Sequence, residues 1–194
     1  MTYGSRNILL LFFFQALVLA NLVSSQEAFT RQKTCSNDAS ITGYNNLTDL
    51  NSDMQDELNR IAGGGTIPSS PYVLSLCPGQ TFTQTDSIKP ILNDLTIVCG
   101  NPTAPTQTCI INGNGPNIDF SNSTVPGYTI NNLVFDSLTF ENFNVVSVNG
   151  FANAPTTATF KNITWQVSTT TKLWISPKCF KHCLHSLPII AIFF

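Results

Sequence analysis

Carboxylates are the first side chains to consider, because pairs of them carry the chemistry of sugar-cleaving enzymes. A glycoside hydrolase needs two carboxyl groups that face one glycosidic bond. Between positions 72 and 171 the chain has only five carboxylates, Asp86, Asp94, Asp119, Asp136 and Glu141. Asp136 and Glu141 could lie near each other, but we interpret all five as solvent-facing turn residues. The sequence therefore predicts no catalytic residues of this kind.

Basic residues are equally sparse in the part of the chain that could bind a charged polymer. A polysaccharide lyase needs a strong base, often Arg, and carboxylates that hold calcium around the substrate. The only arginines are Arg6, Arg31 and Arg60, all before position 72, and Lys89 and Lys161 are the only basic residues from 72 to 171. The net charge is -2, and only 10% of the 194 residues are charged. Because phosphate-binding surfaces need clustered Lys and Arg, nucleic acid is not an expected partner.

Cysteine and histidine gather near the end of the chain, at Cys179, His182, Cys183 and His185. Close Cys and His spacing can hold zinc. We favour oxidised or structural cysteines here, because the chain has the features of an exported protein described below. The sequence also lacks a Gly-x-Ser-x-Gly nucleophile elbow, and Gly63-Gly64-Gly65 is not followed by the Lys-Ser/Thr of a phosphate loop. We predict no metal and no cofactor.

The N-terminal segment over 1–25 resembles a secretory signal peptide. Arg6 lies in a short basic head, Ile8 to Ala20 is an apolar run of signal length, and Val23 and Ser25 are small residues suited to cleavage before Gln26. A membrane anchor would need about 20 apolar residues. We therefore predict a signal peptide over 1–25, a secreted, extracellular protein, and no transmembrane span in the mature chain.

Three sequons and six cysteines agree with export. Asn46, Asn122 and Asn162 each begin an Asn-x-Thr triplet that accepts N-linked glycan. Disulfides persist in an oxidising compartment, although their pairing cannot be read from sequence alone. Our pairing hypothesis joins Cys99 to Cys109, closing a Pro-rich loop, and Cys35 to Cys77, tying the N-terminal segment to the first strand. We name these four as the disulfide candidates.

One helix precedes a long β-rich region. We expect residues 26–43 to be irregular and residues 44–62 to form an amphipathic helix, because five apolar residues recur at three- and four-residue steps, namely Leu47, Leu50, Met54, Leu58 and Ile61. Its acidic residues lie off that stripe, and Gly63 ends the pattern. From Tyr72 onward, short β-rich runs alternate with Gly, Pro, Asn and Ser.

A similarity between two segments of the chain indicates how the strands are arranged. The segment from Phe135 to Glu141 (FDSLTFE) matches the segment from Phe160 to Gln166 (FKNITWQ) in residue type at most positions. Stacked repeats with such an offset are typical of solenoids, in which equivalent positions lie over one another. Phe135 would then lie over Phe160, and Phe140 over Trp165. We predict an all-β right-handed parallel β-helix over 70–168, with coils of about 20–25 residues and an N-terminal capping α-helix.

The runs YVLSLCPG, LTIVCG and CIING, together with the two repeats, resemble secreted right-handed parallel β-helix proteins of the pectin-lyase-like class. The resemblance implies that the N-terminal helix caps the open end of a solenoid. Residues 169–194 depart from the pattern, and we expect this atypical tail to reflect truncation or a mistranslated segment. The chain would then be a truncated copy.

Three functions remain open. We favour a secreted glycoprotein without catalysis, whose scaffold binds extracellular or cell-wall polysaccharide through hydrogen bonds and exposed aromatic rings. The alternative is a fragment of a polysaccharide lyase or glycoside hydrolase whose catalytic coils are missing. Ice binding comes last, because only Thr139 and Thr164 would be in register.

Overall fold

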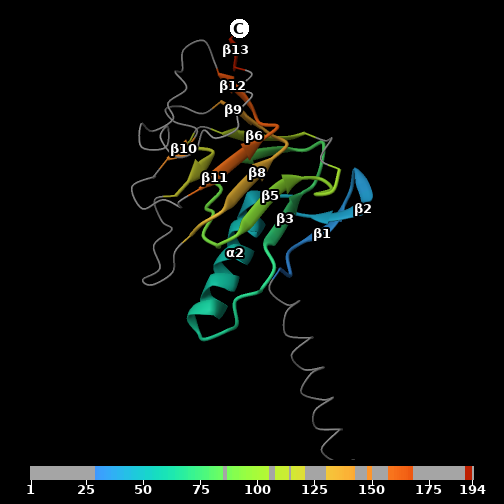
Figure 1. Cartoon of the computed structure of the whole chain (residues 1–194). Coiled ribbons are helices and arrows are strands. Elements are labelled where there is room, and N and C mark those ends of the chain that lie inside the picture. The colour runs from blue at the N-terminus through green and yellow to red at the C-terminus, as the bar shows by residue number, and fades with distance from the viewer. Residues whose placement is uncertain are drawn as a thin grey trace, which may run out of the picture. The chain divides into compact units, whose positions relative to one another are not determined.

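The structure is a computed structural model that describes residues 29–84, 87–104, 108–113, 115–120, 130–142, 148–149, 157–167 and 191–193. The chain divides between Thr30 and Arg31, and every element below belongs to the second part (Figure 1). The predicted signal peptide over 1–25 and nearly all of the predicted tail over 169–194 lie outside the described residues. The same holds for Asp86, Asn122 and the cysteines and histidines at 179–185.

The predicted helix is present as α2 (Leu47–Ala62). Its N-cap is Asn46, whose side-chain oxygen accepts a hydrogen bond from the backbone N–H of Asp49 at 2.7 Å. This contact satisfies one of the amides that every helix leaves free at its first turn. Gly63 ends the helix, and the predicted apolar stripe is buried at Leu47, Leu50, Met54 and Leu58.

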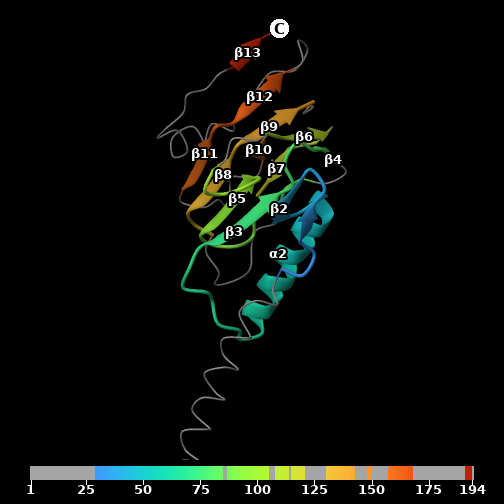
Figure 2. The same cartoon turned by 90° about the vertical axis from the view of Figure 1, so that its right-hand side faces the viewer.

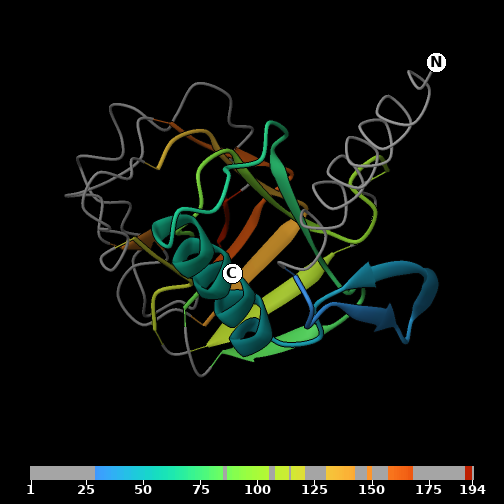
Figure 3. The ribbon, with the colours of Figure 1, turned by 90° about the horizontal axis from the view of Figure 1, so that it is seen from below.

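Residues 26–43 are not irregular as expected, because they contain β1 (Lys33–Cys35) and β2 (Asp38–Gly43). These strands pair antiparallel, and Figures 1 and 3 show the hairpin standing out from the other strands. Where β2 ends, a Cβ added to Gly43 would lie 2.7 Å from the carbonyl oxygen of Ser75. Only glycine therefore allows this close approach of two backbones.

Two parallel sheets make up most of the remainder. The first has the order β11-β8-β5-β3 and consists of β3 (Tyr72–Leu76), β5 (Leu95–Cys99), β8 (Leu133–Asp136) and β11 (Ala158–Lys161). The second has the order β13-β12-β9-β6-β4 and consists of β4 (Thr81–Gln84), β6 (Cys109–Gly113), β9 (Leu138–Glu141), β12 (Thr164–Val167) and β13 (Ala191–Phe193). A shorter parallel pair joins β7 (Ile118–Asp119) to β10 (Val148–Asn149).

The predicted right-handed parallel β-helix, with coils of about 20–25 residues, is wrong. The described residues form parallel sheets of four and five strands, the short parallel pair, the antiparallel hairpin and one helix. In the four-stranded sheet Tyr72 pairs with Leu95, whereas Thr96 pairs with Val134, which lies much further along the chain. The spacing from Phe135 to Phe160 therefore applies to the pairing of β8 with β11, the last two strands of that sheet. It does not repeat along the whole chain, so the two similar segments did not reveal a constant repeat length.

The local pairing of the two similar segments is nevertheless confirmed. Phe135 pairs with Phe160, and Phe140 pairs with Trp165, each across neighbouring parallel strands. The rings of Phe135 and Phe160 stack with centroids 5.3 Å apart. Because parallel in-register strands place like residues side by side, similar sequences produce these aromatic pairs.

The two sheets share one apolar interior. The ring of Phe160 in the four-stranded sheet lies 5.8 Å from the ring of Trp165 in the five-stranded sheet, and both side chains are buried. Figure 2 shows neighbouring strands side by side from β3, near α2, to β11, β12 and β13 toward the other end. The helix lies at the β3 end (Figure 2). There its Glu57 accepts a hydrogen bond from the hydroxyl of Tyr72 at 2.6 Å, and Figure 3 shows α2 from below. The sheets thus have one end joined to a helix and one end formed by aromatic strands.

Candidate functional site

Both predicted disulfides are present. Cys35 is bonded to Cys77, across 42 residues, and Cys99 is bonded to Cys109, across 10 residues. All four side chains are buried. The first bond fastens the β1–β2 hairpin to the end of β3, and the second closes the Pro-rich loop between β5 and β6, as the sequence indicated.

The predicted glycosylation residues Asn46 and Asn162 are both exposed and lie at turns. Asn46 caps α2, and Asn162 separates β11 from β12 with a φ of 50°. That value is in the left-handed region, which Asn tolerates better than most residues. The amide nitrogen of Asn162 donates to Asp136 Oδ1 at 2.9 Å. The structure brings neither asparagine to a site with the cysteines.

Among the described carboxylates considered as catalytic candidates, strand pairing places none of Asp119, Asp136 and Glu141 opposite another carboxylate. Register places Asp136 opposite Lys161, and Glu141 opposite Gln166. Asp94 accepts hydrogen bonds from the amides of Asn93 and Asn132, both at 2.7 Å. These contacts are those of polar turns and of a sheet surface, and they provide no facing acid and base.

The surface best suited to bind a ligand is the outward side of the five-stranded sheet, which we call the polar face. Strand alternation and register place its side chains in two rows, Thr81, Ile110, Thr139 and Thr164 in one and Thr83, Asn112, Glu141 and Gln166 in the other. Equivalent side chains in a row are about 4.8 Å apart, the spacing of hydrogen-bonded strands. Rows of this kind present hydroxyl, amide and carboxylate groups at a regular interval.

Exposure is uneven across the polar face. Thr81, Thr83 and Gln166 are exposed, whereas Thr139 in the middle of its row is only 4% exposed. The side chain of Asn112 is partly exposed and accepts a hydrogen bond from the amide of Asn142 at 3.0 Å. The second row is therefore the more accessible of the two.

Aromatic rings do not contribute to this face. Among the residues whose exposure the structure describes, the tyrosines, the tryptophan and all phenylalanines other than Phe29 are buried. The expectation that exposed aromatics stack on a sugar is therefore wrong for these residues. The physical reason is that rings such as Phe135, Phe160 and Trp165 pack in the interior of the sheets. The hydroxyls of Tyr44 and Tyr72 instead bond to carboxylates of α2.

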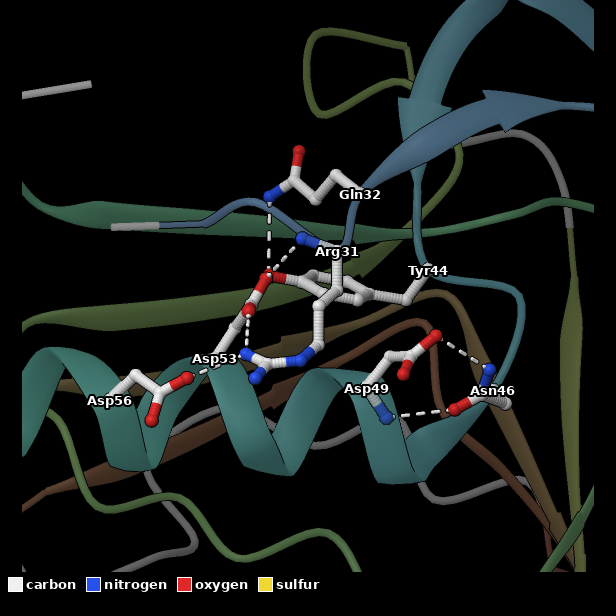
Figure 4. Close-up of polar contacts among 7 residues, drawn as sticks. All are labelled: Arg31, Gln32, Tyr44, Asn46, Asp49, Asp53 and Asp56. Carbon is white, nitrogen blue, oxygen red and sulfur yellow. Dashed lines mark hydrogen bonds and ion pairs between the residues drawn. The ribbon is translucent and has the colours of Figure 1, made fainter. Parts of the chain in front are cut away.

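The densest polar cluster lies elsewhere, where the segment before β1 meets α2 (Figure 4). The Asp53 carboxylate, fully buried, accepts hydrogen bonds from the backbone N–H of Arg31 at 3.0 Å, from Arg31 Nη1 at 2.5 Å and from the Tyr44 hydroxyl at 3.0 Å. Arg31 Nη1 also lies 2.6 Å from Asp56 Oδ2. We call Arg31, Tyr44, Asp53 and Asp56 the Arg31 cluster.

A second buried carboxylate lies one turn further along the helix. The Glu57 side chain is 1% exposed and receives two hydrogen bonds from the guanidinium of Arg60, at 2.6 and 2.7 Å, as well as the one from Tyr72. Two parallel bonds between a guanidinium and a carboxylate are among the stronger pairings in proteins. Arg60 also donates to the carbonyl oxygen of Thr66 at 2.7 Å, which fastens the segment after α2.

Electrostatics agree with a structural role for both clusters. Burial would raise the pKa of Glu57, but hydrogen bonds from Arg60 and Tyr72 outweigh it, so its pKa is lowered from the ordinary value. Burial raises the pKa of the Tyr44 hydroxyl, which keeps that group protonated as a donor to Asp53. The hydrogen bonds to Asp56 and then Asp53 raise the pKa of Arg31.

Sequence reasoning missed these two carboxylates, because it placed the acidic residues of the helix off the buried stripe. Asp53 and Glu57 are instead buried beside Met54 and Leu58. The available signal was their spacing of one helical turn, with Arg60 a further turn after Glu57, since such residues lie on one helix face. A buried carboxylate that already accepts several hydrogen bonds is poorly suited to take a proton from a substrate.

Metal ligands and membrane-spanning helices are the other features to consider in the described ranges. There, no group of three or more His, Cys, Asp or Glu side chains is placed to hold a metal ion. Across the same residues, no helix is both long and apolar enough to cross a membrane. The candidate zinc ligands Cys179, His182, Cys183 and His185 lie outside them.

No protein family, curated protein or solved structure matches the chain. The resemblance to the pectin-lyase-like class therefore stays a prediction from sequence patterns. Function has to be inferred from the polar face and from the residues around it.

Proposed function

We propose that this chain is an exported, disulfide-bonded glycoprotein that binds an uncharged extracellular polysaccharide through the polar face, without catalysis. One observation carries this proposal, namely the register that aligns Thr83, Asn112, Glu141 and Gln166 across four neighbouring strands. An extended polymer has repeated hydroxyl groups, which a repeated row of donors and acceptors can match. Hydrogen bonds of this kind fix the orientation of a sugar chain along the row.

The low charge of the polar face supports the assignment of an uncharged ligand. Glu141 is the one ionisable side chain in the two rows of the polar face. A polyanionic polymer would be repelled by it and would find no cation in either row, whereas a neutral polymer meets mostly hydroxyl and amide groups. Polyanions are therefore expected to bind worst.

Two features support export. The apolar run from Ile8 to Ala20 resembles a signal peptide, and two disulfides join cysteines far apart in sequence or across a loop. Disulfides persist mainly in oxidising compartments. We take both as support for the extracellular part of the proposal.

The experiment is a binding assay of the secreted protein against neutral and acidic polysaccharides, followed by alanine substitutions in the accessible row. Thr83→Ala and Gln166→Ala should each weaken binding about 2- to 10-fold, because one hydrogen bond contributes roughly 0.5–1.5 kcal/mol. Asn112→Ala should do the same. Each of these variants should still fold, and only its affinity for the polysaccharide should fall, because one hydrogen-bonding group has been removed.

The matched controls are Thr96→Ala and Thr159→Ala, which remove the same type of side chain from the outward side of the four-stranded sheet. These variants should bind as the unsubstituted protein does. Equal losses from the controls, or tighter binding of acidic polymers than neutral ones, would contradict the proposal.

A further inference from the structure

The last strands of the two parallel sheets end differently. In the five-stranded sheet β12 is followed by β13, which pairs with it over Ala191–Phe193. In the four-stranded sheet β11 is the outermost strand among the described residues. An outermost strand has one row of backbone N–H and C=O groups available to pair with another chain.

The sequence of β11 offers little protection of its own. Ala158 and Phe160 have buried side chains, and only Lys161 at its end carries a charge. A charged residue is one common way to prevent edge pairing, and covering the edge is another. Because β11 has a single lysine, a second feature that blocks edge pairing is needed if the protein is to stay monomeric.

Asn162 follows β11 directly and begins the triplet Asn162-Ile163-Thr164. Its side chain is exposed, and its amide nitrogen uses one hydrogen in the bond to Asp136. An N-linked sugar replaces only one of the two amide hydrogens, so the bond to Asp136 can persist in the modified protein. Modification at this turn therefore does not require loss of the hydrogen bond to Asp136.

We propose that Asn162 carries an N-linked glycan, and that this glycan prevents β11 from pairing with the same strand of a second copy. In the transfer step, the amide nitrogen forms a bond to C1 of a lipid-diphosphate-linked oligosaccharide. The bond from C1 to the phosphate oxygen breaks, the lipid diphosphate leaves, and the amide loses one proton. The bulky, hydrated sugar is then attached one residue after β11, at the end of the outermost strand.

Asn46 provides the internal comparison. It is also exposed, it begins a sequon, and its amide nitrogen donates to Asp49 Oδ2 at 2.8 Å. It lies at α2, at the β3 end of the sheets, where β3 is already bridged through Tyr44 and Leu76. A glycan at Asn46 should therefore have no effect on association through β11.

The test is expression of the full chain in a secretory host, with peptide mapping of both sequons and measurement of mass in solution by light scattering. Asn162→Gly removes the sequon but suits the left-handed backbone at this turn. We expect a monomeric wild type with sugar on Asn162, and N162G shifted to twice that polypeptide mass or more. Asn46→Gly should stay folded and monomeric, because glycine is also tolerated at a helix N-cap.

Should N162G fail to fold, an endoglycosidase applied to the folded, secreted wild type tests the same step. Unmodified Asn162 in the secreted protein would overturn the proposal, and so would a monomer after sugar removal. The proposal rests on the exported part of the proposed function and not on polysaccharide binding. A chain that is not secreted contradicts export itself, whereas a secreted chain with bare Asn162 contradicts only this inference.

Discussion

The two ends of the parallel sheets are stabilised by different kinds of interaction. At the β3 end, α2 contributes buried carboxylates, which are hydrogen-bonded by Arg31, Tyr44 and Arg60, and a disulfide joins the neighbouring hairpin. At the β12 end, the described interior includes one stacked and two tilted pairs of aromatic rings, with centroids 5.3 to 6.0 Å apart. Polar, directional contacts orient one end, and apolar contact area stabilises the other.

This difference has a physical basis. A helix and a hairpin that meet a sheet have no common register, so specific hydrogen bonds must define their positions. Neighbouring parallel strands already have their register, because the backbone bonds impose it. Similar aromatic residues then pack without further polar contacts, and the free energy of unfolding should depend on different residues at the two ends.

The largest expected effect of a single substitution is at the aromatic end. Phe135→Ala removes a ring that is 1% exposed, between Ile97 and Phe160 in adjacent strands. We expect it to lower the free energy of unfolding by about 3–5 kcal/mol, measured by urea denaturation. The control is Val134→Ala on the outward side of the same strand, which should cost about 1 kcal/mol or less. Similar values for the two would contradict an apolar interior here.

The disulfides should differ in their contributions. Replacing Cys35 and Cys77 by alanine opens a link across 42 residues, whereas replacing Cys99 and Cys109 opens one across 10. Loop-closure entropy predicts losses of about 4 and about 2.8 kcal/mol respectively. Calorimetry of the two double variants would measure the difference, and a larger loss from the short loop would contradict an entropic origin.

The Arg31 cluster should show a smaller effect. Asp53→Ala removes the acceptor of the Tyr44 hydroxyl, which is then left buried without that bond. We expect a loss of about 1–3 kcal/mol in the free energy of unfolding. Asp56→Ala is the matched control, because Asp56 also contacts Arg31 but is exposed. If both variants lost the same amount, burial of Asp53 would not be the cause.

The smallest effect is a dependence of stability on pH. The pKa of Glu57 is lowered in the folded protein, so its ionised form favours folding above its ordinary pKa of 4.5. That contribution should disappear as the pH falls below 4.5 and through the lowered folded pKa. Glu57→Gln should reduce the slope of stability against pH in this acid range. An unchanged slope, measured by urea denaturation at several pH values, would show that other carboxylates are responsible.

Much of the local structure could be predicted from the sequence. The stripe from Leu47 to Leu58 identified α2, and β-rich composition identified β3, β5 and β6. The strand β4 was missed, because TFTQ has little apolar content apart from Phe82. The pairing of the cysteines was inferred from their places along the chain and confirmed.

The predicted fold class was wrong because the spacing of the strands varies along the chain. One repeat, from Phe135 to Phe160, was extended to the whole chain, although the chain between β5 and β8 is much longer than that between β8 and β11. A pairing offset depends on loop length, and loops vary without changing the strands that they join. The polar face could not be predicted from the sequence either, because each of its rows combines residues from four strands that are separated along the chain.

The sequence alone therefore determined which residues form the helix and most strands, because these depend on periodicity and near neighbours. The tertiary structure confirmed the hypothesis for the two disulfides, one of which joins cysteines 42 residues apart. The tertiary structure decided that Asp53 and Glu57 are buried, and that Thr83, Asn112, Glu141 and Gln166 form one row. Burial and register depend on partners that lie far away along the chain. A hydrogen bond from Arg31 to Asp53 or a pairing of Asn112 with Glu141 exists only once the strands and the helix have come together.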